Sequence, residues 1–185
     1  MNFNFFFLNI SIQFLKYFPN LISYIYISKK LSIIKLFFLN FSNSFFFFNS
    51  NKYMIFFNFL LRSSFFRFKS CTDISVIDFL SFHNRFTFYY NFLSSSLNSR
   101  ILIFVNLYNL IRINSISSFF LAANWVEREI YDMFGIYFIA HPNLKRILSD
   151  YGFSDFPLRK KFPSYGVEEI YFSPYYSRIR YSVIQ

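Results

Sequence analysis

The sequence predicts an α+β protein: a mixed sheet with packed helices, a Phe-rich helical N-terminal extension and an extended C-terminal tail. Three observations lead to this fold class. Runs rich in aromatic and β-branched residues, bounded by Ser and Asn, fill the middle of the chain and read as strands. Apolar residues then recur at spacings of three and four between Phe119 and Met133, as in a helix. Beyond Phe153 the chain is rich in Pro and Tyr and has no long periodic run, which indicates an extended segment.

Residues 1–51 form the predicted extension, with one or two helices. Positions 1–70 contain eight Lys or Arg and no acid, so most of the formal net charge of +10 lies there. A membrane-spanning helix needs about 20 mostly apolar residues, and lysines interrupt the apolar runs, which favours helices packed on protein. A basic, acid-free start resembles a transit peptide, but transit peptides are rich in Arg and Ser, whereas this segment is rich in Lys, Phe and Asn. If the gene is mitochondrial, the protein needs no import signal.

Residues 52–152 are predicted to form the folded domain. The segment 93–100, LSSSLNSR, is expected to be the turn of a hairpin. Helical periodicity over residues 74–82 predicts a helix. The predicted strands are residues 53–61, 85–92, 101–108 and 112–116.

The helix over residues 119–133 should begin at Ser117 or Ser118 as N-cap and end at Gly135, which can adopt a left-handed conformation. A short strand is expected over residues 136–139. Pro142 is suited to a first helical position, so a second helix is predicted from His141 to Asp150, ended by Gly152. Arg146 and Asp150 would form an ion pair one turn apart.

Three runs of this region carry a family resemblance. They are WVEREIYDMFGIYF at residues 125–138, HPNLKRILSDYGF at residues 141–153 and PLRK at residues 157–160. In this order they resemble the shared core of the 30-kilodalton subunit of respiratory complex I, which is also called the C subunit or subunit 9 of NADH:ubiquinone oxidoreductase. The resemblance is sharp over residues 122–162, weaker back to Thr72, and absent before about Lys52.

The sequence departs from the family pattern at several positions. Ala140 stands where a glycine usually precedes the His-Pro pair, and Asn143 stands where an acid usually follows it. Asp155 and Phe156 replace a usual Gly-His. Lysines replace an arginine and an acid at positions 145 and 161. These changes bear on local turn geometry and on the charge of one contact.

The resemblance implies a non-catalytic structural subunit of the proton-translocating NADH:ubiquinone reductase. It would lie in the peripheral arm near the quinone-reducing module, on the matrix side of the mitochondrial inner membrane. Its tail, residues 153–185, would lie across the neighbouring 49-kilodalton-type subunit. FMN and the iron–sulfur clusters would be held by other subunits. The signature residues that we expect to be structural or interfacial are Trp125, Glu127, Arg128, Glu129, Asp132, Gly135, His141, Pro142, Arg146, Asp150, Tyr151, Gly152, Pro157, Leu158 and Arg159.

Among these residues, a smaller set is expected to form ion pairs that fix the geometry between subunits. It consists of Arg128, Glu129, Asp132, Arg146 and Arg159.

Composition excludes several kinds of cofactor site in this chain. A structural zinc site or an iron–sulfur cluster needs about four ligands, but Cys71 is the only cysteine and the two histidines, His83 and His141, are far apart. The three glycines are too far apart for a dinucleotide or phosphate loop. We therefore expect no cofactor or metal to be bound by this chain.

Two alternatives remain beside the structural function. Glu127, Glu129 and Asp132 could form an acid/base cluster, although pairing with Arg128, with Arg146 or with a basic group of a neighbouring subunit is favoured. The basic, Phe- and Asn-rich composition, typical of an AT-rich organellar genome, also fits a basic ribosomal or RNA-binding protein, and residues 159–161 could contact RNA. The family resemblance outweighs that second alternative.

Overall fold

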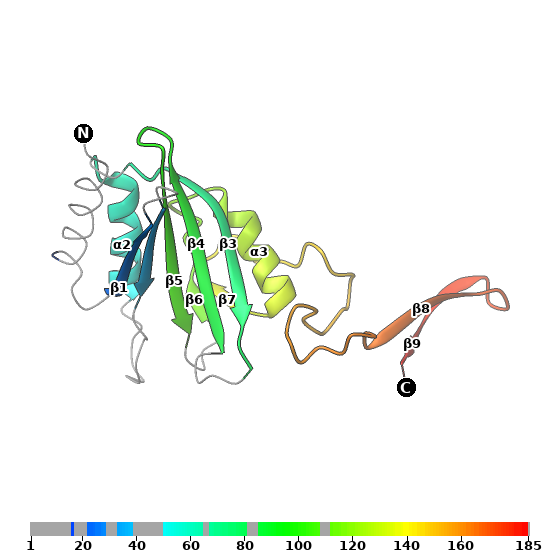
Figure 1. Cartoon of the computed structure of the whole chain (residues 1–185). Coiled ribbons are helices and arrows are strands. Elements are labelled where there is room, and N and C mark those ends of the chain that lie inside the picture. The colour runs from blue at the N-terminus through cyan, green and yellow to red at the C-terminus, as the bar shows by residue number, and fades with distance from the viewer. Residues whose placement is uncertain are drawn as a thin grey trace.

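The computed structural model describes residues 16, 22–28, 33–38, 50–64, 67–80, 85–107 and 112–184 (Figure 1). The two described helices are α2 (Ser50–Arg62) and α3 (Ala123–Phe134). The strands are β1 (Ile22–Ser28), β2 (Ile33–Phe38), β3 (Ser70–Asp78), β4 (Phe86–Ser94), β5 (Ser99–Leu107), β6 (Arg112–Asn114), β7 (Tyr137–Ile139), β8 (Glu168–Ser173) and β9 (Arg178–Val183).

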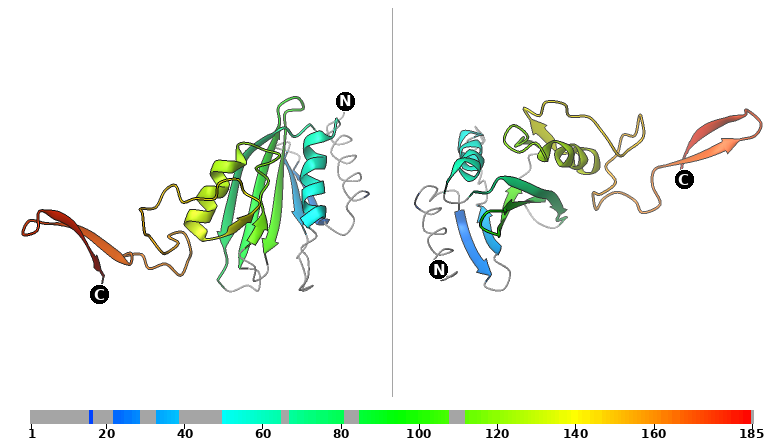
Figure 2. Two further views of the ribbon diagram at one scale, coloured as in Figure 1. Left: turned by 180° about the vertical axis from the view of Figure 1, so that it is seen from behind. Right: turned by 90° about the horizontal axis from the view of Figure 1, so that it is seen from above.

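A five-stranded sheet in the order β1-β2-β5-β4-β3 forms the centre of the domain. The β2–β5 pair is parallel and the other neighbouring pairs are antiparallel. Helices α2 and α3 lie on one face of this sheet (Figure 2). A parallel β6–β7 pair lies beside α3. The α+β class with a mixed sheet is therefore confirmed.

The hydrophobic core lies between the sheet and the two helices. Along β4 every second residue is fully or almost fully buried, because alternate side chains of a strand point to the same face. The ring centroid of Phe57 from α2 lies 5.3 Å from that of Tyr90 and 5.6 Å from that of Phe92. Phe134 of α3 packs edge-on against Phe86, with ring centroids 6.5 Å apart. Such aromatic pairs contribute beyond the area they bury, so part of the Phe-rich composition serves the core.

Two predictions between residues 53 and 78 gave the wrong type of element. Residues 53–61 belong to helix α2, where Phe56, Phe57 and Leu60 are buried together, as on one helical face. Residues 74–78 belong to strand β3, where Ile74 and Val76 are buried and Ile77 is exposed. In each case a short apolar run fitted both periods, and packing against the rest of the domain decided between them.

The N-terminal extension also differs from its prediction. Over residues 22–28 and 33–38 it provides strands β1 and β2 of the central sheet instead of helix. Strand β2 joins the edge of the domain by pairing with β5 in parallel, from Ile33 with Arg100 to Phe37 with Phe104. The other residues of the extension lie outside the described residues, apart from position 16 and the start of α2 at Ser50.

The predicted strands over residues 85–92, 101–108 and 112–116 are confirmed as β4, β5 and β6, with shifted ends. Residues 95–98 form the predicted hairpin turn, in which Asn98 has a φ of 46°. Helix α3 is confirmed, but it begins at Ala123 after Ala122, so the predicted N-caps Ser117 and Ser118 were wrong.

The predicted helix from His141 to Asp150 was wrong, because this stretch consists of turns and bends without a helix. In the tail, β8 and β9 are extended strands as expected, but they pair into an antiparallel hairpin that projects from the domain (Figure 1). Among the helices that the structure describes, none has the length and apolarity needed to cross a bilayer.

Candidate functional site

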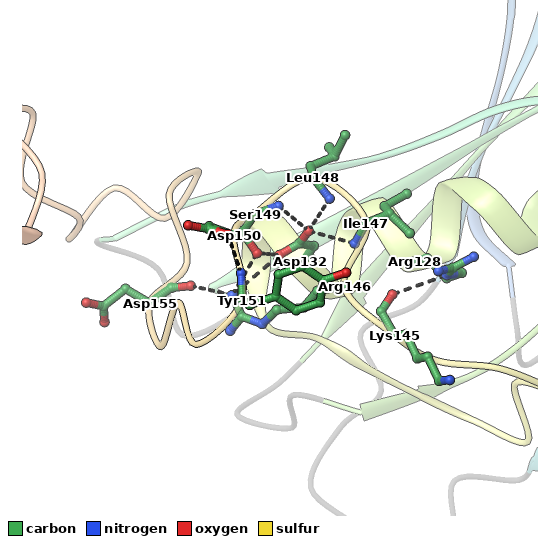
Figure 3. Close-up of polar contacts among 10 residues, drawn as sticks. All are labelled: Arg128, Asp132, Lys145, Arg146, Ile147, Leu148, Ser149, Asp150, Tyr151 and Asp155. Carbon is green, nitrogen blue, oxygen red and sulfur yellow. Dashed lines mark hydrogen bonds and ion pairs between the residues drawn. The ribbon is translucent and has the colours of Figure 1, made fainter. Parts of the chain in front are cut away.

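Asp132, near the C-terminal end of α3, is the centre of the largest polar network in the signature region. Its side chain is fully buried, and its Oδ2 accepts the backbone N–H groups of Ile147 (3.0 Å), Leu148 (2.7 Å) and Ser149 (2.9 Å) (Figure 3). The Ser149 hydroxyl donates to Oδ1, and Arg146 Nη1 lies 3.4 Å from the same oxygen. Burial raises the pKa of Asp132, but these hydrogen bonds outweigh it and hold the pKa below its usual value. Asp132 therefore fixes the loop that follows β7.

Arg146 connects this loop to the segment after it. Its Nη1 donates to the Ser149 hydroxyl (3.2 Å) and to the carbonyl of Asp155 (3.1 Å), and its guanidinium lies 5.1 Å from the ring centroid of Phe156. The predicted ion pair with Asp150 was therefore wrong. Asp150 instead accepts the N–H of Tyr151 (2.7 Å) and the hydroxyl of Tyr181 (3.1 Å).

Arg159 closes the C-terminal end of α3. Its Nε donates to the carbonyl of Phe134 at 2.6 Å, where a helix leaves carbonyls without intrahelical partners. Its guanidinium stacks on the ring of Phe156, 4.2 Å from the centroid. Gly135 ends the helix with a φ of 68°, as predicted, and a Cβ there would lie 2.5 Å from Phe156 Cζ and 2.6 Å from Arg159 Nη2. A glycine is therefore required both by the backbone and by the close approach of residues 156–159.

Asp78, at the end of β3, binds the same segment from the sheet side. Arg85 makes two hydrogen bonds to it, Nε to Oδ1 (2.8 Å) and Nη2 to Oδ2 (3.0 Å), and the backbone N–H of Lys160 donates to Oδ2 at 3.0 Å. The hydrogen bonds from Arg85 hold the pKa of Asp78 below its usual value in spite of burial. Residues 156–160, which the sequence placed in the tail, are thus fixed on the domain. The sequence-based prediction of site residues missed Asp78 and Arg85, although the scarcity of acids in this chain was a usable signal.

Glu127 forms a second buried network on α3. Its fully buried carboxylate accepts the Ser115 hydroxyl (Oε2, 2.5 Å) and the backbone N–H of Ile116 (Oε1, 2.8 Å). The Ser117 hydroxyl lies 2.6 Å from that of Ser115 and extends the chain of hydroxyl groups. Burial raises the pKa of Glu127 to about 7, although both hydrogen bonds act in the opposite sense. A hydroxyl can donate or accept, so Ser115 is suited to either protonation state of Glu127.

His141 lies beside Glu127, with Nε2 3.8 Å from Oε2. Its Nε2 bonds the carbonyl of Asn124 (3.2 Å) and its Nδ1 accepts the N–H of Asn143 (3.1 Å). A carbonyl requires a donor and an N–H requires an acceptor, so these contacts fix the neutral ring with the proton on Nε2. Burial, aided by the charge of Arg128, lowers the pKa of His141. His141 therefore holds the turn after β7 by hydrogen bonds. This is a structural function, as expected, although no helix follows.

Ala140 shows the effect of one departure from the family pattern. Its φ is 60°, in the left-handed region where a residue with a Cβ is strained. This is the position at which a glycine is usual in the resembling family. Ala140 therefore adopts a backbone conformation that a glycine would adopt with less strain.

The other predicted site residues lie on the surface or partly so. Trp125 is 65% exposed, with Arg128 over its ring at 5.1 Å from the centroid, and Arg128 Nε donates to the carbonyl of Lys145 at 3.2 Å. Glu129 is exposed and does not join Glu127 or Asp132 in a cluster. The remaining predicted residues Pro142, Tyr151, Gly152 and Leu158 are exposed, and Pro157 is half-buried.

The buried carboxylates of this region hold loops in place by hydrogen bonds. Each buried carboxylate accepts hydrogen bonds from the backbone of a loop: Asp132 from residues 147–149, Asp78 from Lys160, and Glu127 from Ile116. In the described part of the chain, no group of His, Cys, Asp and Glu side chains is arranged to hold a metal ion. Asp132 pairs with Arg146, which is one of the partners that the sequence left open, and it does so within the chain. We name the set Asp78, Glu127, Asp132, Arg146 and Arg159 the polar anchors.

The comparisons with known proteins agree on one family. A family model described as the 30 Kd subunit of respiratory-chain NADH dehydrogenase matches residues 48–168. The chain is 44% identical over 126 residues to NADH-ubiquinone oxidoreductase subunit 9 of Acanthamoeba castellanii, covering 68% of this chain and 64% of the relative. It is 42% identical over 127 residues to the mitochondrial NADH dehydrogenase (ubiquinone) iron-sulfur protein 3 of Candida albicans, covering 69% and 46%.

Further similarity extends to a bacterial protein and to solved structures. The C subunit of NADH-quinone oxidoreductase from Ruegeria pomeroyi is 41% identical over 129 residues, covering 70% of this chain and 64% of that protein. A trypsin-resistant fragment of Nqo5 matches with a TM-score of 0.52 and 22% identity, covering 74% and 98%. A chain of an archaeal membrane-bound sulfane sulfur reductase matches with a TM-score of 0.67 and 18% identity, covering 84% and 85%.

At such identities the two structures show a shared fold. This chain spans 43% to 64% of the length of the first three curated relatives it matches.

Proposed function

The chain belongs to the family of the 30-kilodalton subunit of respiratory-chain NADH dehydrogenase, and from this premise we propose that it is a structural and assembly subunit of the peripheral arm of mitochondrial respiratory complex I. One observation carries the proposal. The matched residues 48–168 include all the polar anchors, which join α3, the 141–152 loop and residues 156–160 into one body. The region that the family model matches is thus a folded domain whose loops are fixed by buried hydrogen bonds.

We further propose that the chain supports electron transfer from NADH to ubiquinone without binding a redox centre. In support, the carboxylate of Asp132 is occupied by three backbone N–H groups and an arginine, and that of Glu127 by a hydroxyl and a backbone N–H. Groups held in this way position loops. FMN and iron–sulfur clusters would then belong to other subunits, and the chain would act as a non-catalytic part of the proton-translocating reductase.

We also propose that its neighbour is the 49-kilodalton-type subunit of the quinone module, on the matrix side of the inner membrane. The hairpin β8–β9 supports a contact with another subunit, because it projects from the domain with most of its side chains exposed (Figure 1). The mitochondrial relatives support the compartment. The bias toward Phe, Ile, Asn, Lys and Tyr supports an organelle-encoded gene.

A native gel in mild detergent, stained for NADH oxidation, tests this function. Organelle membranes are separated, and mass spectrometry locates the chain among the bands. We expect it in the large NADH-oxidising band together with cluster-bearing subunits. Co-migration with ribosomal particles would overturn the proposal and favour the RNA-binding alternative, for which the comparisons give no support.

A further inference from the structure

The β8–β9 hairpin has two chemically different faces. Residues directly opposite each other in an antiparallel pair point to the same side, and successive residues alternate. The register pairs Glu168 with Val183, Ile170 with Tyr181, and Phe172 with Ile179. These six residues form one face, which we name the apolar face. The other face carries Glu169, Tyr171, Ser173, Arg178, Arg180 and Ser182.

The apolar face is uncovered. Ile170 is 54% exposed, Phe172 62%, Ile179 63% and Val183 71%. A single two-stranded hairpin is at best marginally stable in water, and a contiguous exposed apolar patch marks a contact surface. The register therefore gathers the apolar side chains on the side where nothing else in the described chain buries them.

On the opposite face, both arginines lie over an aromatic ring of the same hairpin. The guanidinium of Arg180 lies 3.7 Å from the ring centroid of Tyr176, and that of Arg178 lies 5.4 Å from it. Arg180 and Ser182 are half-buried on this face. Stacking of this kind holds arginine side chains along an aromatic ring, so this face is less in need of a partner.

One hydrogen bond links the apolar face to the folded domain. The Tyr181 hydroxyl donates to Asp150 Oδ2 at 3.1 Å, which turns this face toward the loop that Asp132 fixes. In that loop Leu148 is 59% exposed and Tyr151 is fully exposed. A partner that covers the hairpin from this side therefore approaches a second exposed apolar group.

We propose that the apolar face of the β8–β9 hairpin is a docking surface for another protein subunit, which covers Ile170, Phe172 and Ile179 with apolar side chains and places a cationic side chain beside Glu168. This inference rests on the proposed function, because it requires a partner subunit. It goes beyond it by assigning the contact to one face of the hairpin and by stating the partner's chemistry.

Charge placement favours a protein over a membrane as the occupant. The attraction of a peripheral element to an anionic bilayer comes from Lys or Arg side chains that can reach the lipid phosphates. Here the charged residue on the apolar face is Glu168, and both arginines, Arg178 and Arg180, lie over the ring of Tyr176. A hairpin lying on a bilayer by its apolar face would therefore present a carboxylate to the lipid phosphates.

Thiol labelling at neighbouring positions can separate the two faces. Cys71 gives little background, because it is buried and burial raises its pKa to about 12. Phe172→Cys and Ile179→Cys report on the apolar face. Their matched controls are Tyr171→Cys and Arg178→Cys, which are sequence neighbours on the other face. Each full-length variant is labelled with a maleimide as the free chain and again within the assembled complex.

We expect assembly to slow labelling at positions 172 and 179 by at least about tenfold, and at positions 171 and 178 by less than about twofold. The inference would be overturned by equal protection of both faces or by protection of positions 171 and 178. It would also be overturned by protection of the free chain on adding vesicles with anionic lipid, which would assign the face to a membrane.

The native gel keeps this test separate from that of the proposed function. If the unmodified chain is absent from the NADH-oxidising band, the proposed function fails. The docking inference is then decided by labelling in the complex with which the chain does migrate, and a chain that migrates alone overturns it.

Discussion

The segment 141–160 and the hairpin that follows it differ in an instructive way. The first has no helix or strand, yet its backbone is held by Asp132, by Asp78 and by the carbonyl of Met133 at the end of α3. The second has a regular ladder of paired strands, yet its side chains are mostly exposed. Regular backbone geometry and attachment to the domain are thus separate properties, and buried polar groups supply the attachment here.

Physical reasons support this difference. A buried carboxylate that receives several N–H groups fixes each donor, and loss of the acceptor leaves those donors unpaired. A two-stranded hairpin pairs its own backbone but buries little apolar area. Changes in the polar anchors should therefore destabilise segment 141–160. The exposure of the hairpin should change only when a partner binds.

The largest effect is expected from Asp132→Ala. It removes the acceptor of three backbone N–H groups and leaves Arg146 partly buried beside an unfilled site, so we expect the free energy of unfolding to fall by about 3–5 kcal/mol. Urea denaturation of the full chain measures it. Glu129→Ala, an exposed position on the same helix, is the control and should change the value by less than about 0.5 kcal/mol. Equal effects of the two variants would contradict the anchoring of the loop by Asp132.

Gly135→Ala should be next in size, at about 2–4 kcal/mol. The new Cβ would need a left-handed backbone, and it would also displace the ring of Phe156 and the guanidinium of Arg159. Gly152→Ala is a matched control, since its φ is 82° but nothing lies within 4 Å of the added Cβ, so only the backbone cost of about 1–2 kcal/mol applies. Denaturation midpoints of both variants give the comparison. If the two glycines were equally sensitive, the contact of residues 156–159 with the helix end would have no energetic weight.

Glu127 should make stability depend on pH near neutrality. Its pKa is raised from 4.5 to about 7 in the folded chain, so between these values the folded state holds a proton that the unfolded state has lost. Stability should therefore fall as the pH rises through this window, by up to about 3 kcal/mol in total. Below its usual pKa of 6.5, His141 acts in the opposite sense, because its pKa is lowered on folding.

The difference between the wild-type chain and Glu127→Gln isolates this contribution, since His141 is present in both. The unfolding free energy of the wild type, taken relative to that of the variant, should decrease from pH 5 to pH 7.5. Parallel curves would show that Glu127 is ionised throughout, with its hydrogen bonds to Ser115 and Ile116 outweighing burial.

The smallest effect is expected from removal of the hairpin. A chain ending after Gly166 loses the exposed Tyr181–Asp150 hydrogen bond but none of the polar anchors, so its free energy of unfolding should stay within about 1 kcal/mol. A chain ending after Asp150 also loses Arg159 and the contact of Lys160 with Asp78, and should be several times more affected. Similar losses in both truncations would mean that the hairpin is part of the folded body.

The sequence predicted helices and strands correctly where only one periodicity, helical or strand-like, fitted the apolar residues. Helix α3, its end at Gly135 and the hairpin of β4 and β5 were predicted because their apolar spacing and turn residues agree. Residues 53–61 and 74–78 were assigned the wrong element, because short runs rich in Phe and Ile fit a helix and a strand alike. Near α3, the sequence left Arg146 open as one of several partners for Asp132, and it paired Arg146 with Asp150 wrongly.

The sequence by itself determined the family and the class of fold, since these depend on residue types and their order along the chain. Only the tertiary structure decided the partner of each charged group. Asp132 binds a loop 15 to 17 residues away and Asp78 binds a backbone N–H 82 residues away. A buried carboxylate takes the donors that folding brings to it, and nothing in the local sequence specifies which donors those are.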